Sequence, residues 1–392
     1  MLPFEKIRVA DFTTMLAGAG ICTTLCDMGA DVIKIEPPDG DPWRLMGASF
    51  IGTNRGKRGI VIDLTREEGR QIAHKLIGTA QLLVENFRPG ITQKLSLDYE
   101  RVRKINPEII YVSSPAYGAH GPYARLPGYD PLLQAMSGQM EGQGGVGKTP
   151  VFHKIALNDE AAPPIGAFGA ALALFHKLRT GKGQFLETSL LACAVALQSD
   201  RFIDYPGAKH RNIGKPEIRG LCATNRLYQA MDGEWFYLLC TAEEHWQALC
   251  KAIGMPELID DPRFATPAAR RRHDKALTAI MESSFLTTVA NAWIGVLQAA
   301  GVPAVACTGG DAIFDDPHCE AIGVFIKQQD PLFGNVKLLG VTPQLSETPG
   351  RVPRPSPLLG QHTEEVLREL GYSQAEIDEL KAKRLVVQAA MP

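Results

Sequence analysis

Residues 153–188 read HKIALNDEAAPPIGAFGAALALFHKLRTGKGQFLET, and the rest of the chain can be organised around them. The middle of this stretch, Pro163 to Arg179, is rich in small residues and has the pattern of a long helix. Basic residues and a glycine, Gly181, follow as a typical helix stop, and Gln184 to Glu187 then has the pattern of a strand. The stretch therefore predicts a helix followed directly by a strand.

Asn158 and Asp159 precede this predicted helix and are residue types that commonly cap helix N-termini. We therefore expect Asp159 to lie where the helix begins. The helix dipole and the free N–H groups there are expected to keep its carboxylate ionised. A cap contributes about 1 kcal/mol to stability, so capping alone would account for the residue.

Composition restricts the class of protein. A chain of 392 residues exceeds one ordinary core and predicts two domains, and 45% hydrophobic with 21% charged residues is typical of a soluble globular protein. The net charge of −2 predicts no surface for a polyanion, so nucleic acid is not expected as a partner. We expect a cytoplasmic protein without membrane attachment, because we see neither a signal peptide nor an apolar run of transmembrane length.

The 8 cysteines show no CxxC pair, which indicates free thiols rather than disulfides or a metal site. Cys22 and Cys26 lie four residues apart in a predicted helix with no histidine nearby. We therefore expect them to be buried packing residues.

Strands and helices alternate through the first part of the chain, which predicts a mostly parallel, doubly wound sheet. The helix that follows the third strand is predicted to open with a capping box, Thr65-Arg66-Glu67-Glu68. Strands are predicted at 7–12, 31–36, 59–64, 82–85 and 108–114, and helices at 16–28, 65–77 and 98–106.

The pattern changes after residue 200. A charged, glycine-containing linker is predicted at 201–221, and a smaller α+β domain with a hairpin at Met231-Asp232-Gly233 at 222–326. A proline-rich linker at 327–357 is predicted to lead to helices at 361–370 and 373–380. The predicted domains are thus 1–200 for the large one, 222–326 for the small one, and a C-terminal part, 358–392, that returns to the large one.

A match to the phosphate-binding P-loop pattern GxxxxGK[ST] occurs at Gly142 to Thr149. A working P-loop needs a strand before it and a helix that starts at the Lys-Thr pair. The preceding residues, 130–136, are predicted to be helical, and Pro150 follows. We therefore interpret the match as a glycine-rich loop.

Gly18-Ala19-Gly20 is similar to part of a dinucleotide-binding fingerprint. Five residues separate the predicted strand from Gly18, and Thr23 stands where the third glycine is expected. Close packing of the helix on the sheet is therefore the favoured interpretation.

Several segments in chain order share the motifs of one family and together cover nearly the whole chain. They are Leu16-Ala17-Gly18, Gly29 to Pro38, Asn54 to Arg58, Val84 to Gly90, Tyr117 to Pro122, Gly128-Tyr129-Asp130, Asp159 with Gly169 and Arg179 to Gln184, and Leu359 to Thr363. The chain resembles the family III CoA-transferases, the CaiB/BaiF family of formyl-CoA transferase, carnitine CoA-transferase and α-methylacyl-CoA racemase. Its departures from the family's usual residues are Leu16, Pro37, Ala116 and Pro163.

The resemblance implies a doubly wound, Rossmann-like large domain, with coenzyme A bound at the carboxyl ends of the strands. Cations would meet the phosphates, Phe87 would lie against adenine, and Ala17 with Gly18 would let the pantetheine arm approach the backbone. The residues implied for CoA binding are Leu16, Ala17, Arg58, Asn86, Phe87, Arg88, Lys94 and Tyr117, and those implied for the acyl group are Tyr129 and Met140. CoA and acyl-CoA would be substrates, with no permanently bound cofactor and no metal.

The resemblance also implies the reaction. CoA would move from an acyl-CoA to a carboxylic acid through an anhydride and an enzyme-CoA thioester on Asp159, the implied nucleophile. An interlocked homodimer is implied as well, in which each chain threads through the other.

Two alternatives stay open. A racemase or epimerase of the same fold needs two acid-base groups beside the α-carbon. Those relatives carry histidine where this chain has Tyr129, although His120 or His153 could substitute. The other alternative is a CoA-binding protein without catalytic activity.

Overall fold

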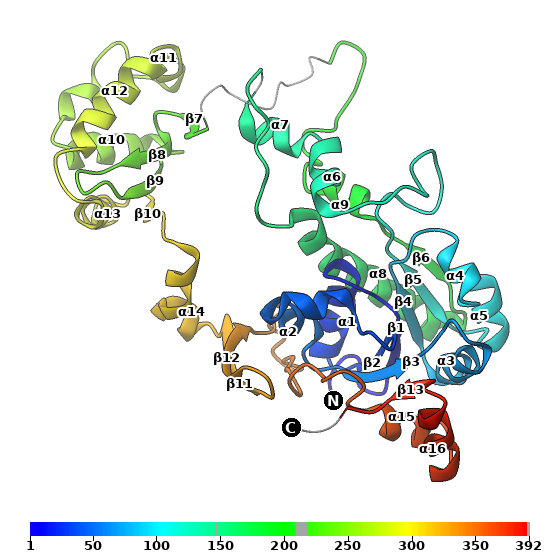
Figure 1. Ribbon diagram of the computed structural model, residues 1–392. Helices are drawn as coiled ribbons and strands as arrows, with labels where there is room; N and C mark the ends of the chain where they lie inside the picture. Colours follow the sequence, from blue (N-terminus) through cyan, green and yellow to red (C-terminus); the bar gives the residue numbers. More distant parts are fainter. Residues whose placement is uncertain (146, 209–217, 390–392) are drawn as a thin grey trace. The chain divides into compact units, whose positions relative to one another are not determined.

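The computed structural model describes residues 1–145, 147–208 and 218–389 (Figure 1). These residues form two compact units. The larger unit comprises residues 1–140, 152–208 and 317–389, and the smaller comprises 141–145, 147–151 and 218–316. The units differ from the predicted domains in two places, because residues around 145 group with the smaller unit and residues 317–326 with the larger one. Residues 209–217 of the predicted linker lie outside the described residues.

The larger unit is built on a seven-stranded sheet with the order β13-β3-β2-β1-β4-β5-β6. All neighbours are parallel except β13, which pairs antiparallel with β3. The parallel strands follow the order of a doubly wound sheet, so the fold class predicted for this part is confirmed. The strands are β1 (Arg8–Asp11), β2 (Asp31–Glu36), β3 (Arg58–Ile62), β4 (Leu82–Glu85), β5 (Ile110–Ser113), β6 (Phe185–Glu187) and β13 (Val386–Val387).

Helices cover both faces of this sheet (Figure 1). Successive side chains of a strand point to opposite faces, so the sheet has two cores. One core contains Ile72, Val102 and Val366 from helices α3, α5 and α15, and the other contains Ile21 and Ala170 from α1 and α8. The helices of the larger unit are α1 (Ala17–Asp27), α2 (Ala48–Asn54), α3 (Glu67–Thr79), α4 (Ile91–Lys94), α5 (Tyr99–Ile105), α6 (Asp130–Met136), α8 (Leu157–Thr180), α9 (Leu190–Ala196), α14 (Pro317–Ala321), α15 (Thr363–Glu369) and α16 (Gln374–Ala382), with the 3-10 turn η1 (Pro42–Met46).

Helices α1 and α8 pack closely because small residues lie where they cross. A Cβ atom added to Gly20 would come within 2.4 Å of the Pro163 side chain, and one added to Gly166 would come equally close to Ile21. Gly18 is crowded in the same way by Thr13. The glycines similar to a dinucleotide fingerprint therefore serve packing, although against a helix and a loop rather than against the sheet.

The smaller unit has an antiparallel sheet with the order β10-β9-β8-β7 and a core of its own. Strands β8 and β9 flank the Met231-Asp232-Gly233 turn, as predicted. The elements of this unit are β7 (Gly220–Cys222), β8 (Asn225–Gln229), β9 (Trp235–Leu239), β10 (Ala304–Ala306), α10 (Glu243–Ala252), α11 (Pro267–Arg272), α12 (Asp274–Phe285) and α13 (Ala290–Ala299), with the 3-10 turns η2 (Pro256–Ile259) and η3 (Gly310–Asp315).

Two predictions made at this level were wrong. The Thr65 capping box does not form, because Arg66 is the N-cap of α3 and the Thr65 hydroxyl donates to Asp63 instead. The predicted linker 327–357 is partly ordered as a hairpin of β11 (Phe325–Asp330) and β12 (Gly334–Leu339).

In the described part of the chain, no single helix has both the length and the hydropathy of a membrane span. Helices α12 and α13 have this length and hydropathy only when taken together, and the two are bent by 112° relative to each other.

Candidate active site

Asp159 lies in the first turn of α8, which begins at Leu157, so the expectation that Asp159 lies at the beginning of the helix is confirmed. The N-cap is Ala156 and makes no side-chain cap, so the expectation that Asp159 caps the helix is wrong. Pro163 and Pro164 lie inside the helix rather than at its beginning. A proline has no N–H to donate to the carbonyl four residues before it, so the carbonyls of Asp159 and Glu160 lose their usual helical partners.

A second carboxylate, Asp130, takes the N–H groups at the start of α8. Its Oδ1 accepts the backbone N–H of Asn158 at 2.8 Å and that of Asp159 at 3.4 Å. The Gln134 side chain donates to the other oxygen of Asp130, and Gln139 donates to the Asn158 side chain. Asp130 is 4% exposed and is the first residue of α6, so a neighbouring helix caps α8.

The Asp159 carboxylate makes no hydrogen bond to any described residue and is only partly buried. Burial, together with the negative charges of Asp130 and Glu160, raises the pKa of Asp159 to about 7. The expectation that the helix N-terminus keeps this carboxylate ionised is therefore wrong. The N–H groups that would stabilise its charge are directed at Asp130.

Several residues implied for CoA binding lie together near this helix start. Leu16 is the uncapped N-cap of α1 and Ala17 its first residue. Ala17 and Tyr117 belong to one apolar cluster with Ala161 and Ala162, which follow Asp159 in the same helix. The tertiary structure thus brings the first βα loop, the loop after β5 and the first turn of α8 to one place.

Asn86, after β4, holds the first βα loop by two hydrogen bonds. Its Oδ1 accepts the Thr14 N–H at 2.9 Å and its Nδ2 donates to the Thr14 carbonyl at 2.8 Å. Both polar ends of this side chain are used in the loop. Asn86 therefore shapes the region at the carboxyl ends of β1 and β4.

A buried group of charges supports the same loop. Lys34 and Lys57 are both completely buried, and they pair with Asp41 at 2.9 Å and with Asp11 at 2.8 Å. Lys34 also donates to the Thr13 carbonyl, and Asp41 accepts the Met15 N–H. Met15 has φ +62°, an unfavourable conformation for a residue with a side chain, which these contacts hold in place.

From the sequence, Lys34 and Lys57 were identified only as parts of family motifs, and Asp11 and Asp41 were not identified. Asp11 and Lys34 lie in buried strands and Lys57 directly precedes one, where a charged residue is unexpected unless it is paired. That interruption of the apolar pattern is the signal that could have identified them.

Arg58 is in a different place. It starts β3, at the amino ends of the parallel strands, and its guanidinium pairs with Asp31, Glu365 and Glu369 at 2.6 to 2.7 Å. Ligands of open α/β sheets bind at the opposite, carboxyl ends. We therefore correct the implied role of Arg58 from a phosphate contact to a link between the sheet and α15.

Phe87 and Arg88 line a cavity of about 410 Å³ at the carboxyl ends of β4 and β5. Tyr99, His120 and the buried Glu85 also line this cavity. Burial raises the pKa of Glu85 to about 7. This position agrees with the usual ligand crevice.

The remaining implied residues are less enclosed. Lys94 is exposed in the last turn of α4. Tyr129, the N-cap of α6, is 62% exposed, and Met140 is partly buried in α7 (Gln139–Gly144). Leu16, with Glu160 and Pro163, lines a small cavity of about 130 Å³.

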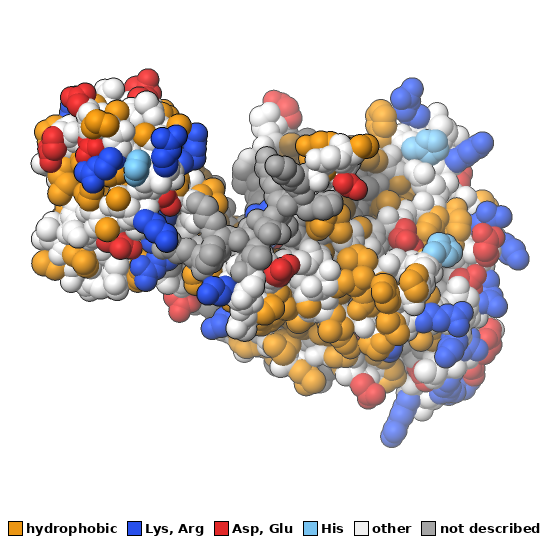
Figure 2. Space-filling view, turned by 90° about the horizontal axis from the view of Figure 1, so that it is seen from above, with side chains coloured by type: hydrophobic (Ala, Val, Ile, Leu, Met, Phe, Trp, Pro, Cys, Tyr) orange, Lys and Arg blue, Asp and Glu red, His pale blue; other side chains and the backbone are white. Residues whose placement is uncertain are grey.

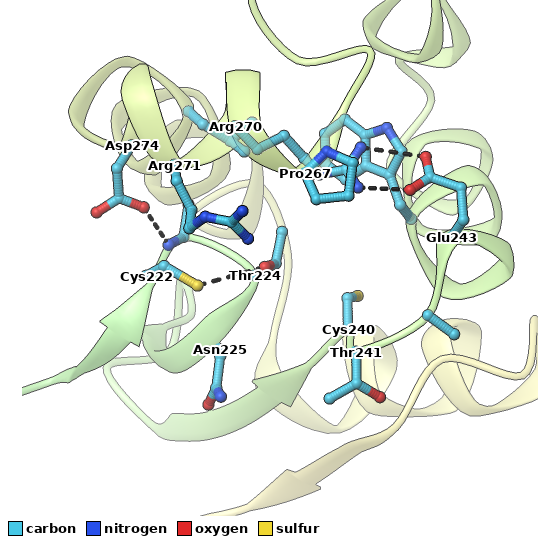
Figure 3. A pocket seen from close by; sticks show the side chains of 14 residues that line it. Cys222, Thr224, Asn225, Cys240, Thr241, Glu243, Pro267, Arg270, Arg271 and Asp274 are labelled. Carbon is cyan, nitrogen blue, oxygen red and sulfur yellow. Dashed lines mark hydrogen bonds and ion pairs between the residues drawn. The ribbon is translucent and has the colours of Figure 1, made fainter.

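The smaller unit has its own cavity of about 320 Å³, between the β7–β8 turn and helices α10 to α12 (Figure 3). Arg270 pairs with Glu243 at 2.6 Å, and Asp274 accepts the Ala223 N–H at 2.7 Å. Cys222 and Cys240 are also in the wall, and Arg271 points into the space between the strands and α11. None of these residues was predicted from the sequence.

Neither a P-loop nor a metal site is present among the described residues. Helix α7, rather than a strand, covers Gly142 to Gly144, and no helix starts between residues 147 and 156. Val146 of the match lies outside the described residues. In the same part of the chain no group of three potential metal ligands occurs, and all cysteines are free, with Cys22 and Cys26 buried as expected.

The strand order and the helices on both faces define the larger unit as an α/β fold with a cavity at the carboxyl ends of β4 and β5. The model of CoA-transferase family III matches residues 4–363, and the chain belongs to this family.

Similar proteins carry more particular names. Succinyl-CoA--D-citramalate CoA-transferase of Chloroflexus aurantiacus is 32% identical, with 98% of each chain covered. Succinyl-CoA:glutarate CoA-transferase of Homo sapiens is also 32% identical, over 98% of this chain and 90% of its own. A solved structure of a CaiB/BaiF family protein from Brucella suis has a TM-score of 0.85 at 32% identity, over 94% of this chain and 99% of that one.

Proposed function

We propose that the protein transfers CoA from an acyl-CoA to a carboxylic acid with Asp159 as the nucleophile. The observation that carries this proposal is the Asp159 carboxylate itself. It is partly buried, has no hydrogen-bond donor or cation among the described residues, and has a pKa raised to about 7. A carboxylate that is poorly stabilised in the resting protein is a stronger nucleophile than a solvated one.

The proposed reaction proceeds in balanced steps. A carboxylate oxygen of Asp159 bonds to the thioester carbon, the C–S bond breaks, and the CoA thiolate leaves an aspartyl-acyl anhydride. The thiolate then attacks the aspartyl carbonyl, which releases the donor's carboxylate and leaves an aspartyl-CoA thioester. The acceptor carboxylate reverses these steps, and no net proton is consumed.

The carbonyl oxygens become negatively charged in each tetrahedral intermediate. Backbone N–H groups of the glycine-containing loops near the start of α8 are the proposed donors to them.

We infer that the substrates are small dicarboxylic acids and their CoA thioesters. The relatives named above are succinyl-CoA transferases for citramalate and glutarate, and a further relative from Agrobacterium fabrum, 34% identical, is named succinate--glutarate CoA-transferase. Tyr129 and Met140 are the residues proposed to contact the acyl group.

The proposed CoA contacts follow the carboxyl edge of the sheet. Leu16 and Ala17 would border the pantetheine arm, Phe87 the adenine, and Arg88 and Lys94 the phosphates. Asn86 and Tyr117 would act by shaping the loops on which these contacts lie, which their observed packing supports.

We also propose an interlocked homodimer. Helix α8 carries an exposed apolar stripe in which Phe168 is 66% and Phe175 is 60% exposed, with Ile165, Leu172 and Leu178 on the same helix. Figure 2 shows how hydrophobic side chains gather over a broad area of the larger unit. A surface of this kind favours burial against a second copy. Light scattering at micromolar concentration should give the dimer mass, and a stable folded monomer would contradict the assembly.

Asp159→Asn tests the proposed mechanism, because it preserves the shape of the side chain and removes the attacking anion. Transfer from succinyl-CoA to glutarate should fall by several orders of magnitude, measured by mass spectrometry of the thioesters formed. Wild type incubated with succinyl-CoA alone should carry a hydroxylamine-sensitive modification on the peptide that contains Asp159.

The matched control is Glu160→Gln, a neighbouring acid on the same turn, which should retain transfer. A fully active Asp159→Asn protein would overturn the proposal. Exchange of solvent deuterium into a 2-methylacyl-CoA without an acceptor acid would instead favour the racemase alternative.

A further inference from the structure

Asp130 and Asp159 form an unusual pair, since two carboxylates lie at the start of one helix and only one of them uses its N–H groups. In a helix with a side-chain cap, the N-cap residue of the same helix usually accepts these N–H groups. Here Asp130 does so from α6, at 2.8 Å from the Asn158 nitrogen. We propose that Asp130 is a positioning residue that caps α8 in place of Asp159 and thereby leaves the Asp159 carboxylate free to react. This inference rests on the proposed role of Asp159.

Asp130 is itself held rigidly. Gln134 donates to its Oδ2 and also to the His153 carbonyl, while the His153 N–H donates to the Gln134 side-chain oxygen. The Asn158 side chain donates to the Asp130 carbonyl at 3.4 Å. The carboxylate that caps α8 is therefore held by hydrogen bonds from both α6 and the start of α8.

The same arrangement acts on the charge of Asp159. Asp130 places a negative charge beside Asp159, and that charge, after burial, is the first contributor that raises the pKa of Asp159. Glu160 contributes less. Burial raises the pKa of the Cys193 thiol of α9, and the negative charge of Asp159 raises it further.

The other elements that pack against α8 bring no compensating cation to Asp159. The Lys57 ammonium group donates hydrogen bonds to Asp11, to the Ala19 carbonyl and to Asn54 instead. The further titratable groups on these elements are Cys22, Cys26 and Asp27 of α1, Tyr111 of β5 and Glu187 of β6. None of them contributes to the raised pKa of Asp159.

Two substitutions separate the two effects of Asp130. Asp130→Asn retains an oxygen that can accept the Asn158 N–H and removes the charge. Asp130→Ala removes the acceptor as well, so the free N–H groups of α8 can attract the Asp159 carboxylate and draw it away from the substrate. Neither substitution removes a group that is proposed to touch CoA.

We expect distinct kinetic results. In wild type, kcat/KM for succinyl-CoA should rise with pH through an apparent pKa of about 7. In Asp130→Asn this limb should move to lower pH by about one pH unit or more, with kcat above the limb kept within about tenfold. In Asp130→Ala, kcat should fall about a hundredfold while KM for succinyl-CoA changes little.

Glu160→Gln is the charge control, since it removes a neighbouring negative charge and no cap. It should move the limb less than Asp130→Asn and leave kcat unchanged. A limb that stays at its wild-type pH in Asp130→Asn would overturn the inference. So would an Asp130→Ala protein whose only defect is a raised KM.

A measurement independent of activity completes the test. Carboxyl ¹³C NMR of aspartate-labelled protein, with the Asp159 signal assigned by its loss in Asp159→Asn, should show the pKa of Asp159 falling in Asp130→Asn. This readout needs no turnover, so it applies even if Asp130→Ala does not fold. If Asp159→Asn were fully active, the proposed function would fail, while the titration would still report whether Asp130 governs Asp159.

Discussion

Asp11 and Asp159 are two enclosed carboxylates of the same unit with opposite surroundings. Asp11 is fully buried and its oxygens accept from Lys57, from the Thr13 N–H and from the Thr13 hydroxyl. Asp159 is partly buried and receives no such contact from the described residues. Burial alone would raise the pKa of Asp11, but Lys57 and Lys34 lower it, whereas burial and Asp130 raise that of Asp159.

The difference separates an acid paired with a cation from an acid without one. The charges around Asp11 are neutralised in pairs and fix the loop from Thr13 to Leu16, which we propose borders the pantetheine arm. The charge of Asp159 is left without a cation, which costs stability, and we propose that this carboxylate is the nucleophile. Burial is common to both acids, so the presence or absence of a partner is what distinguishes them.

Removing Lys57, the cation that pairs with Asp11, should have the largest effect on stability. Lys57→Met would leave Asp11 buried without its partner, and breaking a buried ion pair in this way typically costs about 3–5 kcal/mol. Urea denaturation should show the loss as a lower midpoint. Asp159→Asn is the contrasting control and should not be destabilised at pH 7. A Lys57→Met protein as stable as wild type would remove the distinction between the two acids.

The pH dependence of stability should differ in sign for the two acids. The pKa of Asp159 in the folded protein is about 7. Between the ordinary carboxyl pKa and pH 7, the folded chain therefore holds a proton that the unfolded chain has lost. The free energy of unfolding should fall across this range as pH rises, by up to about 4 kcal/mol. The folded pKa of Asp11 is lowered. The contribution of Asp11 to the stability of the folded protein is therefore complete above the ordinary carboxyl pKa. It is lost as pH falls through the lowered pKa of Asp11 in the folded protein.

Asp159→Asn should consequently gain stability relative to wild type as pH rises from 4.5 to 7.5, measured by urea denaturation at several values. Glu85→Gln provides a matched comparison, because burial also raises the pKa of Glu85 to about 7. Identical pH slopes in wild type and Asp159→Asn would contradict a raised pKa at Asp159.

Disturbing the contact between α1, which follows the Asp11 loop, and α8, which carries Asp159, should have a smaller effect on stability. Gly20→Ala would place a Cβ atom 2.4 Å from the Pro163 side chain, and overpacking of this kind typically costs about 1–3 kcal/mol. The thermal midpoint should fall accordingly. Adding Pro163→Ala should restore part of the loss if the clash is with Pro163, and a double variant no better than Gly20→Ala alone would place the strain elsewhere.

Much of the larger unit could be predicted because its patterns are local. The strands at 31–36 and 82–85 were predicted with their observed bounds, and α5 lies within the helix predicted at 98–106. The helical pattern was identified only from Pro163 onwards because prolines resemble a helix beginning, whereas Pro163 and Pro164 lie inside α8 and Pro163 packs against Gly20. Arg58 was misassigned because its partners, Glu365 and Glu369, are distant in sequence.

The family, the alternation of strands and helices, and the position of Asp159 near the start of a long helix follow from local sequence, because motifs and hydrophobic periodicity are carried by neighbouring residues. The folded chain was needed to show that Asp130 rather than Asp159 caps α8, that Lys34 and Lys57 neutralise Asp41 and Asp11, and that Arg58 lies at the amino ends of the strands. These features depend on which charges approach each other across the fold and on how far burial removes them from water, and neither is written in local sequence.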